Sequence, residues 1–172
     1  PNASTTLSTK ADALLFMSLL NSNSPKYLIK EQMKATKFIF KNKIETISTG
    51  YIIFEPGMKV GEIGEADLIK INDLKTTTSW ARVAKYFDYK ILYLEAGSGA
   101  TTPLPQNLIS ICKKEYDGIL FVGGGIKTPE QAKAAAVAGA DWIVTGNLVE
   151  SCTDYNLLKS KLKLLIDEIK NQ

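Results

Sequence analysis

Five short apolar runs alternate with longer amphipathic stretches, and this alternation restricts the fold more than any other feature of the sequence. The runs are rich in apolar residues that do not alternate strictly with polar ones, which is typical of strands buried on both faces of a parallel sheet. The sequence therefore predicts an α/β fold with a parallel sheet. The strands are expected at Ala13–Met17, Thr46–Phe54, Lys90–Leu94, Gly118–Val122 and Trp142–Thr145.

Helices are predicted between these strands. Tyr27–Asn42 places Ile29, Met33 and Phe40 roughly on one face, which is expected to be its buried face. Further helices are predicted at Thr76–Phe87, at Leu104–Glu115, from Thr128 and from Asp154. The helix from Thr128 combines a capping threonine, a proline at its first position and a glutamine three residues on, which together predict a capping box.

Three of the predicted strands end in loops that contain glycine. Glu95 comes where the third strand gives way to Gly97 and Gly99, while Gly124–Gly125 and Gly146–Asn147 follow the last two strands. Glycine lets the backbone approach a ligand closely, and a helix that starts next to such a loop attracts anions. The sequence therefore predicts a phosphorylated ligand at one rim of the sheet, with the Glu95 carboxylate beside it as the candidate base.

Composition excludes several classes of function. The 172 residues are 45% apolar and carry a net charge of +3 on scattered lysines, so no concentrated basic face for nucleic acid is visible. Histidine is absent, which leaves acid–base work to carboxylates, lysine or tyrosine and favours a hard metal such as magnesium. Cys112 and Cys152 fall on predicted helices without metal-ligand spacing, and the sequence shows neither a secretory signal nor an apolar run of about 18 residues. We expect a cytoplasmic protein without a transmembrane segment.

The phosphate signal favours a (β/α)8 barrel over an open doubly wound sheet, because barrels commonly bind phosphate after their last two strands. A closed barrel needs eight strands in about 250 residues, whereas five strands are predicted here. The chain also begins at Pro1 without methionine. We expect residues 1–172 to form one domain that lacks its first three strand–helix units.

Several motifs together resemble one known family. The segments ADALLFMSLLNS (11–22), TGYIIFEPG (49–57), YLEAGSGA (93–100), VGGGIKTPEQA (122–132) and AGADWIVTGN (138–147) are similar, in the same order, to geranylgeranylglyceryl phosphate synthases. These archaeal-type prenyltransferases start ether-lipid synthesis. The resemblance runs from Pro1 to about Glu150, and the match of several unrelated segments makes it specific.

The resemblance implies a modified (β/α)8 TIM barrel, of which this chain carries about five C-terminal units. It also implies transfer of a polyprenyl group from its diphosphate to the C3 hydroxyl of sn-glycerol 1-phosphate, with Mg²⁺ as cofactor. No metal ligand can be named, because the family's magnesium-binding residues would lie upstream of Pro1. The glycerol phosphate would be held by Tyr93, Leu94, Glu95, Ala96, Gly97, Ser98, Gly99, Gly124, Gly125, Gly146 and Asn147.

The resemblance leaves other interpretations open. If Glu95 is not the base, its carboxylate only accepts backbone hydrogen bonds and so braces the loop. The glycines can likewise serve only to form tight turns. Two further functions are another phosphate-binding barrel isomerase or synthase, and a non-catalytic fragment that only binds phosphate. Lys30 replaces a glycine of the family pattern in the segment PKYLIKEQ (25–32). We expect Lys127 to face solvent, the segment Glu55–Glu65 to form a rim loop, and the protein to form a homo-oligomer that contacts membrane surfaces transiently.

Overall fold

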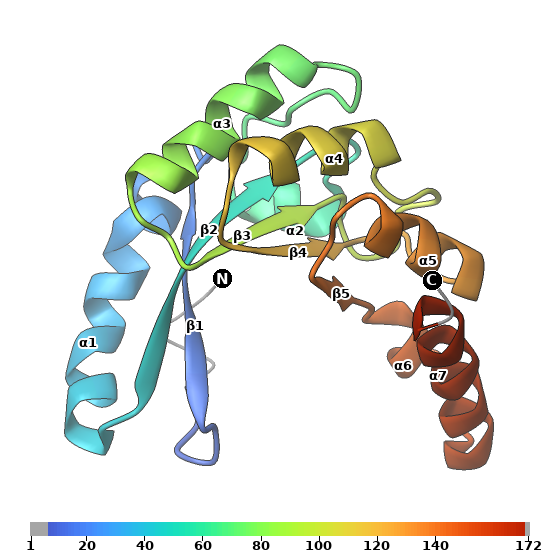
Figure 1. Cartoon of the computed structure of the whole chain (residues 1–172). Helices are drawn as coiled ribbons and strands as arrows, with labels where there is room; N and C mark the ends of the chain where they lie inside the picture. The colour runs from blue at the N-terminus through green and yellow to red at the C-terminus, as the bar shows by residue number, and fades with distance from the viewer. Residues whose placement is uncertain (1–6, 171–172) are drawn as a thin grey trace.

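Five parallel strands lie side by side in chain order in this computed structural model, which describes residues 7–170. At least one helix follows each strand (Figure 1). The alternation predicted from the sequence is therefore confirmed. The strands are β1 (Ala13–Leu19), β2 (Glu45–Ile53), β3 (Ile91–Glu95), β4 (Ile119–Gly123) and β5 (Trp142–Val144).

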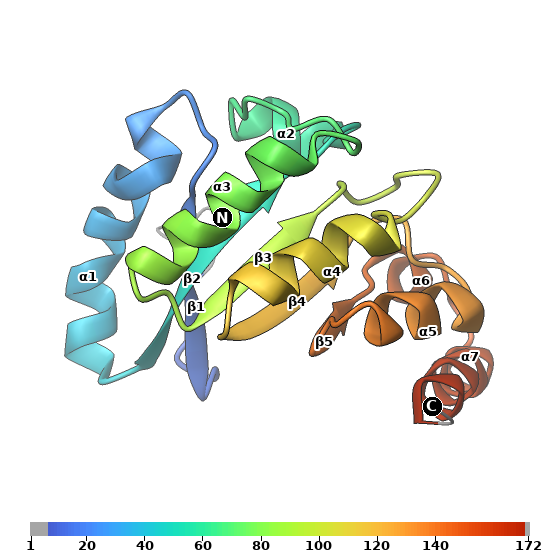
Figure 2. The ribbon, with the colours of Figure 1, turned by 45° about the horizontal axis from the view of Figure 1, so that its top comes forward.

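The main helices line the outer side of the curved sheet, as Figures 1 and 2 show from two directions. Thr128 and Gln131 form the predicted capping box at the start of α5, and Asp154 accepts a hydrogen bond from the Leu157 amide at 2.9 Å at the start of α7. The helices are η1 (Lys26–Lys30, a π-helical turn), α1 (Glu31–Asn42), α2 (Met58–Ile63), α3 (Leu74–Tyr86), α4 (Gln106–Glu115), α5 (Pro129–Val137), α6 (Asn147–Glu150) and α7 (Tyr155–Lys170).

Alternate residues of each strand point to opposite faces of the sheet. Leu92 and Leu94 belong to a large buried cluster that also contains side chains of α3, α4 and α5. Tyr51, Ile53 and Tyr93 belong to a second cluster together with Leu19 of β1. The sheet thus separates an outer core, packed against helices, from an inner face that carries large aromatic side chains.

The register brings the carboxyl ends of the central strands together. Glu95, the last residue of β3, pairs with Ile53 of β2 on one side and with Gly123 of β4 on the other. Because all five strands are parallel, the loops after them leave the same edge of the sheet. This edge carries the glycine-bearing loops identified in the sequence.

Towards the amino ends of the strands, the inner face is open. A hollow of about 330 Å³ is lined by apolar residues that include Leu15, Ile119, Phe121 and Trp142. The Trp142 side chain is 61% exposed and stacks on Phe121, with ring centroids 5.4 Å apart. Within the described residues the strands form an arc, whose ends are β1 and β5, and do not close a barrel.

The predicted buried face of the first helix is wrong. Ile29, Met33 and Phe40 are 58%, 61% and 88% exposed, whereas Gln32 and Ala35 are buried. The Gln32 amide donates to the backbone oxygens of Met17 and Tyr27, so a polar side chain anchors α1 to β1. The π-helical turn η1 adds a residue to the repeat and rotates the helix that follows, a change that apolar spacing alone does not reveal.

Two smaller expectations also differ from the structure. The Glu55–Glu65 segment contains helix α2, whose Gly61 is buried next to Ile53 and Leu68. Three glycines hide this helix from a propensity-based prediction, and packing on the sheet end stabilises it. Cys152 lies in the turn between α6 and α7, whereas Cys112 is buried in α4 as predicted.

Candidate active site

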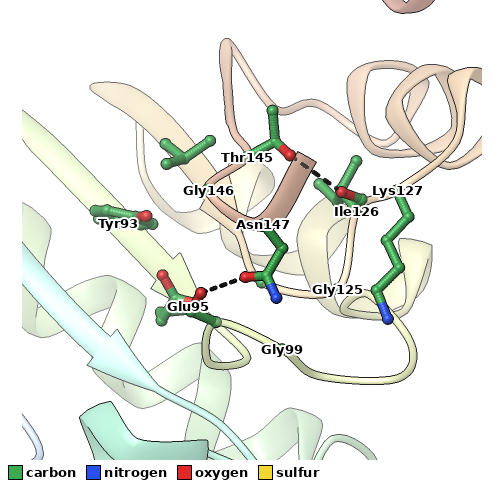
Figure 3. A pocket seen from close by; sticks show the side chains of 12 residues that line it. Tyr93, Glu95, Gly99, Gly125, Ile126, Lys127, Thr145, Gly146 and Asn147 are labelled. Carbon is green, nitrogen blue, oxygen red and sulfur yellow. Dashed lines mark hydrogen bonds between the residues drawn. The ribbon is translucent and has the colours of Figure 1, made fainter. Parts of the chain in front are cut away.

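A pocket of about 130 Å³ opens where the loops after β3, β4 and β5 meet. Figure 3 shows its side chains converging from these three strand ends. The cavity is small, so it suits a compact polar ligand or one end of a larger one. It is lined by Tyr93, Glu95, Ser98, Gly99, Gly124, Gly125, Ile126, Lys127, Val144, Thr145, Gly146 and Asn147.

Glu95 occupies the buried side of this pocket and is only 6% exposed. The Gly97 amide donates to Glu95 Oε1 at 2.7 Å, and the side chains of Tyr93 and Tyr51 lie near the carboxyl group. Burial raises the pKa of Glu95, whereas the hydrogen bond from Gly97 and the nearby Tyr93 and Tyr51 side chains act in the opposite direction. A carboxylate with a raised pKa, held at a pocket wall, is suited to accept a proton from a bound hydroxyl.

Glycines in and after β4 make room for Glu95. Gly123 faces Glu95 in the register, and a Cβ atom there would lie 2.7 Å from the Tyr93 hydroxyl and 3.1 Å from Glu95 Oε2. Gly124 has a φ of +85°, and its Cβ would lie 2.6 Å from Glu95 Oε1. A side chain at either position would displace the carboxylate, so both glycines set the position of Glu95.

The loop after β4 continues tightly into α5. Gly125 has a φ of +72°, and a Cβ there would lie 2.4 Å from the Thr102 backbone oxygen. In the capping box the Lys127 and Thr128 amides both donate to Gln131 Oε1, at 2.8 and 3.2 Å. Because the Lys127 and Thr128 amides already donate to Gln131, an anion at this loop would accept hydrogen bonds from the backbone amides of its glycines.

The rim after β5 is more open. Gly146 has an ordinary negative φ of −97°, and a Cβ there would meet no atom closer than 3.7 Å. Ser98 Oγ donates to Asn147 Oδ1 at 2.5 Å and so links the loops after β3 and β5. Thr145 Oγ1 donates to the Ile126 backbone oxygen at 3.3 Å. These two bonds tie the rim to its neighbours across the pocket.

The structure brings most of the predicted site residues together, but not all of them. Leu94 and Ala96 are buried in the outer core, and Gly97 packs against the Gly57 backbone, so these three do not line the pocket. Sequence reasoning missed Ile126, Val144 and Thr145 as lining residues, and Lys127 is exposed, as expected, yet also lines the pocket. These residues stand close to Gly125 or Gly146 in the sequence, and this position could have identified them as lining residues.

The described residues do not form a metal site. No group of three or more His, Cys, Asp or Glu side chains within residues 7–170 is arranged to hold a metal ion. The expected ligands upstream of Pro1 lie outside the described residues. No helix within these described residues has the length and apolar character needed to cross a bilayer.

Comparison with known proteins gives consistent results. The PcrB family model matches residues 1–164. The chain is 49% identical over 150 residues to the geranylgeranylglyceryl phosphate synthase of Thermoplasma acidophilum, covering 87% of this chain and 59% of that protein. It is 43% identical over 173 residues to the corresponding synthase of Thermoplasma volcanium, covering 99% of this chain and 69% of the relative.

Solved structures agree with this result. The crystal structure of (S)-3-O-geranylgeranylglyceryl phosphate synthase from T. acidophilum in complex with sn-glycerol 1-phosphate has a TM-score of 0.93 and 45% identity, over all of this chain and 68% of that one. The wild-type synthase from T. volcanium matches with the same TM-score, the same coverage and 42% identity. This likeness confirms the TIM-barrel-like fold class. The chain therefore belongs to the PcrB family, and within it resembles the geranylgeranylglyceryl phosphate synthases.

Proposed function

We propose that the protein containing this chain transfers a geranylgeranyl group from its diphosphate to the C3 hydroxyl of sn-glycerol 1-phosphate. The observation that carries the proposal is the pocket itself, in which the buried Glu95 carboxylate faces the glycine loops after β4 and β5. Relatives named as synthases of this kind, one of them crystallised with sn-glycerol 1-phosphate, support it. The chain spans 59% and 69% of the lengths of the two relatives described, so the activity is proposed for the whole protein.

In this proposal the glycine loops hold the phosphate of the acceptor. Backbone amides of Gly124, Gly125 and Gly146 surround it, with Ser98 and Asn147 at the rim. The predicted roles of Leu94, Ala96 and Gly97 become structural, since these residues support Glu95 and its loop from outside the pocket. Fixing the phosphate orients the glycerol hydroxyls, an effect worth roughly several kcal/mol of the barrier.

The chemical step is an alkyl transfer. The C3 hydroxyl oxygen forms a bond to C1 of the prenyl diphosphate while the bond from C1 to the diphosphate oxygen breaks. Glu95 accepts the hydroxyl proton, and the diphosphate leaves with its electron pair. Positioned proton transfer of this kind contributes roughly 10²–10⁴-fold to a rate.

The magnesium ion implied by the family resemblance remains part of the proposal. Residues 7–170 contain no cluster of carboxylates that could hold this ion. The roles proposed for Glu95 and for the glycine loops do not depend on it. We also propose that the arc belongs to a larger barrel domain, and that the protein is cytoplasmic, forms a homo-oligomer and contacts membrane surfaces transiently to handle its lipid substrate and product.

The test uses the full-length protein with magnesium, labelled sn-glycerol 1-phosphate and geranylgeranyl diphosphate. Label should move into an organic-extractable product. A parallel reaction with a sugar phosphate should give none, which separates this activity from that of other phosphate-binding barrels. Crystals soaked with sn-glycerol 1-phosphate should show its phosphate between Gly125 and Gly146. Absence of transfer, or phosphate density at another part of the rim, would overturn the proposal.

A further inference from the structure

Helix α1 and the π-helical turn η1 before it present an apolar stripe to solvent. Ile29, Met33 and Phe40 follow one another at spacings of four and seven residues, which places them on one face, and each is more than half exposed. The side towards β1 holds Gln32 instead, whose amide donates to the Met17 backbone oxygen. A polar side chain thus lies against the sheet while apolar ones stay outside, which is the reverse of what core packing favours.

A row of lysines accompanies this stripe. Positions 26 to 43 hold six lysines and one carboxylate, Glu31, whereas the rest of the chain holds 15 basic and 17 acidic side chains. Glu31 is buried and pairs with Lys34 at 2.6 Å, and the other five lysines form no ion pair with any residue that the structure describes. All six are exposed, namely Lys26, Lys30, Lys34, Lys37, Lys41 and Lys43. We call the apolar stripe and these lysines together the α1 surface.

The α1 surface begins at the edge of the sheet that carries the candidate active site. The loops after the parallel strands leave this edge, and η1 follows the loop after β1. The Asn23 amide donates to the Glu65 backbone oxygen at 2.9 Å, which ties this loop to the segment after β2. Figures 1 and 2 show α1 at one end of the arc and α7 at the other. A flat partner lying along α1 would therefore reach the edge at which the pocket opens.

A hollow of about 720 Å³ extends the α1 surface at the carboxyl end of the helix. It combines apolar walls with positive charge, and its lining includes Phe16, Ile39, Phe40, Lys41, Lys43 and Ile44. Apolar space beside lysines matches amphipathic molecules with anionic head groups, because such molecules need both an apolar and a cationic contact.

We propose that the α1 surface docks the protein on an anionic membrane, with α1 lying in the plane of the bilayer interface. The lysines of a basic amphipathic helix attract anionic head groups, and its exposed apolar side chains enter the boundary between head groups and acyl chains. Met33 and Phe40 are the apolar anchors, and Lys37 and Lys41 lie next to Phe40 in the helix. The inference rests on the membrane contact proposed above and gives that contact a location.

A second copy of the chain fits this surface less well than a membrane does. In a two-fold interface the same patch meets itself, so the lysines of one copy would lie close to those of the other. Lysine is also depleted from interfaces between proteins, whereas it is typical of helices that bind anionic lipid. The charge of the α1 surface therefore favours the membrane.

The test measures binding of the full-length protein to lipid vesicles by co-sedimentation. We expect binding to phosphatidylcholine vesicles with about a third phosphatidylglycerol, little binding to phosphatidylcholine alone, and release by salt. The double variant Lys37→Glu, Lys41→Glu should weaken binding at least about twentyfold, since each lysine near such a surface contributes about 1 kcal/mol, or about fivefold. Phe40→Ser should weaken it about tenfold, because an apolar anchor is lost.

Helix α7 supplies the matched controls. It also carries exposed lysines and the exposed Leu164, but its four lysines stand beside Asp167 and Glu168. The double variant Lys161→Glu, Lys163→Glu and the single variant Leu164→Ser should leave vesicle binding unchanged. Circular dichroism checks that every variant is folded. Prenyl transfer from substrate dispersed in detergent should be the same in the α1 variants as in the unchanged protein, because the α1 surface is no part of the pocket.

The outcomes separate this inference from the proposed function. Equal binding to the two kinds of vesicle overturns it, as does a loss of binding in the α7 variants equal to that in the α1 variants. An altered oligomeric state of the α1 variants, measured by light scattering without vesicles, assigns the surface to a second copy and also overturns it. Vesicle binding that depends on α1 in a protein that transfers no prenyl group supports the docking surface and overturns the proposed transfer. Prenyl transfer by a protein that binds no vesicles overturns the docking surface and leaves the proposed transfer supported.

Discussion

The pocket has two sides that differ in how they are built. Its buried side consists of Glu95, Gly124 and Gly125, with Gly123 directly before them in β4, and an added Cβ atom at any of the three glycines would lie within 2.4 to 2.7 Å of another atom. Its exposed rim consists of Ser98, Gly146 and Asn147, where a Cβ at Gly146 would meet nothing closer than 3.7 Å. The same residue type thus serves two purposes. Glycine on the buried side is needed for the fold and for the position of the Glu95 carboxylate, whereas Gly146 has open space around it.

The largest effect is expected from Glu95→Gln on the buried side. Glutamine retains the size of the side chain but cannot take the proton, so turnover should fall by about 10²–10⁴-fold while sn-glycerol 1-phosphate still binds. Turnover would be measured in the full-length protein and binding by calorimetry. Glu115→Gln, which changes a half-buried carboxylate on α4 that pairs with Arg82 away from the pocket, is the control. Near-normal turnover in Glu95→Gln would show that Glu95 only braces the loop on the buried side and that the base lies elsewhere.

Gly125→Ala should mainly affect stability. The new Cβ would lie 2.4 Å from the Thr102 backbone oxygen at a φ of +72°, and a strained backbone of this kind costs about 1–3 kcal/mol before any clash is relieved. We expect a clear fall in the free energy of unfolding, measured by urea denaturation, together with a raised KM for sn-glycerol 1-phosphate. An unchanged free energy of unfolding would contradict this prediction, because it would show that Gly125 tolerates a side chain as well as Gly146 does.

Gly146→Val should separate binding from folding. The residue has a negative φ and open space around it, so its effect on stability should stay within about 0.5 kcal/mol. The valine side chain would occupy the space through which a phosphate approaches the backbone, and we expect KM for sn-glycerol 1-phosphate to rise about tenfold, the equivalent of one lost hydrogen bond to an anion. A large loss of stability with an unchanged KM would contradict this prediction, because it would show that Gly146 serves folding and not binding.

The smallest effect is expected from Asn147→Ala. This change removes the acceptor of the 2.5 Å hydrogen bond from Ser98 at an exposed position, and such bonds contribute about 0.5–1.5 kcal/mol. We expect a few-fold rise in KM and little change in turnover. Asn42→Ala, which removes an exposed side-chain bond to the Phe38 backbone oxygen, provides the control and should leave KM unchanged.

The strands and the edge that carries the site could be predicted because local sequence determines them. Each strand is a short apolar run, and parallel topology then places Glu95, Gly124 and Gly146 at one edge without further information. The buried face of α1 could not be predicted, since it depends on a π-helical turn and on Gln32, a polar residue. Helix α2 was missed because contacts of Gly61 with Leu68 and Ile53 outweigh the low helix propensity of this glycine.

Within the candidate site, the sequence indicated Glu95 as the candidate base but did not reveal its surroundings. Glu95 and Gly97 stand in one motif, whereas Tyr51, which packs against Tyr93 near Glu95, belongs to a strand 44 positions earlier in the chain than Glu95, and only the register places it there. The role of Gly123 is hidden for the same reason, because it faces Glu95 across β3 and β4. Contacts between strands depend on register, which a single sequence specifies only indirectly.

The stacked pair Phe121–Trp142 gives the protein a built-in optical reporter. Trp142 is one of two tryptophans in the chain, is 61% exposed on the open inner face, and lies on the strand that leads directly to Gly146. Indole emission moves to shorter wavelength when water around the ring is replaced by apolar groups. Emission from Trp142, isolated by replacing Trp80 with phenylalanine, therefore records when the inner face becomes covered, and it does so without a label.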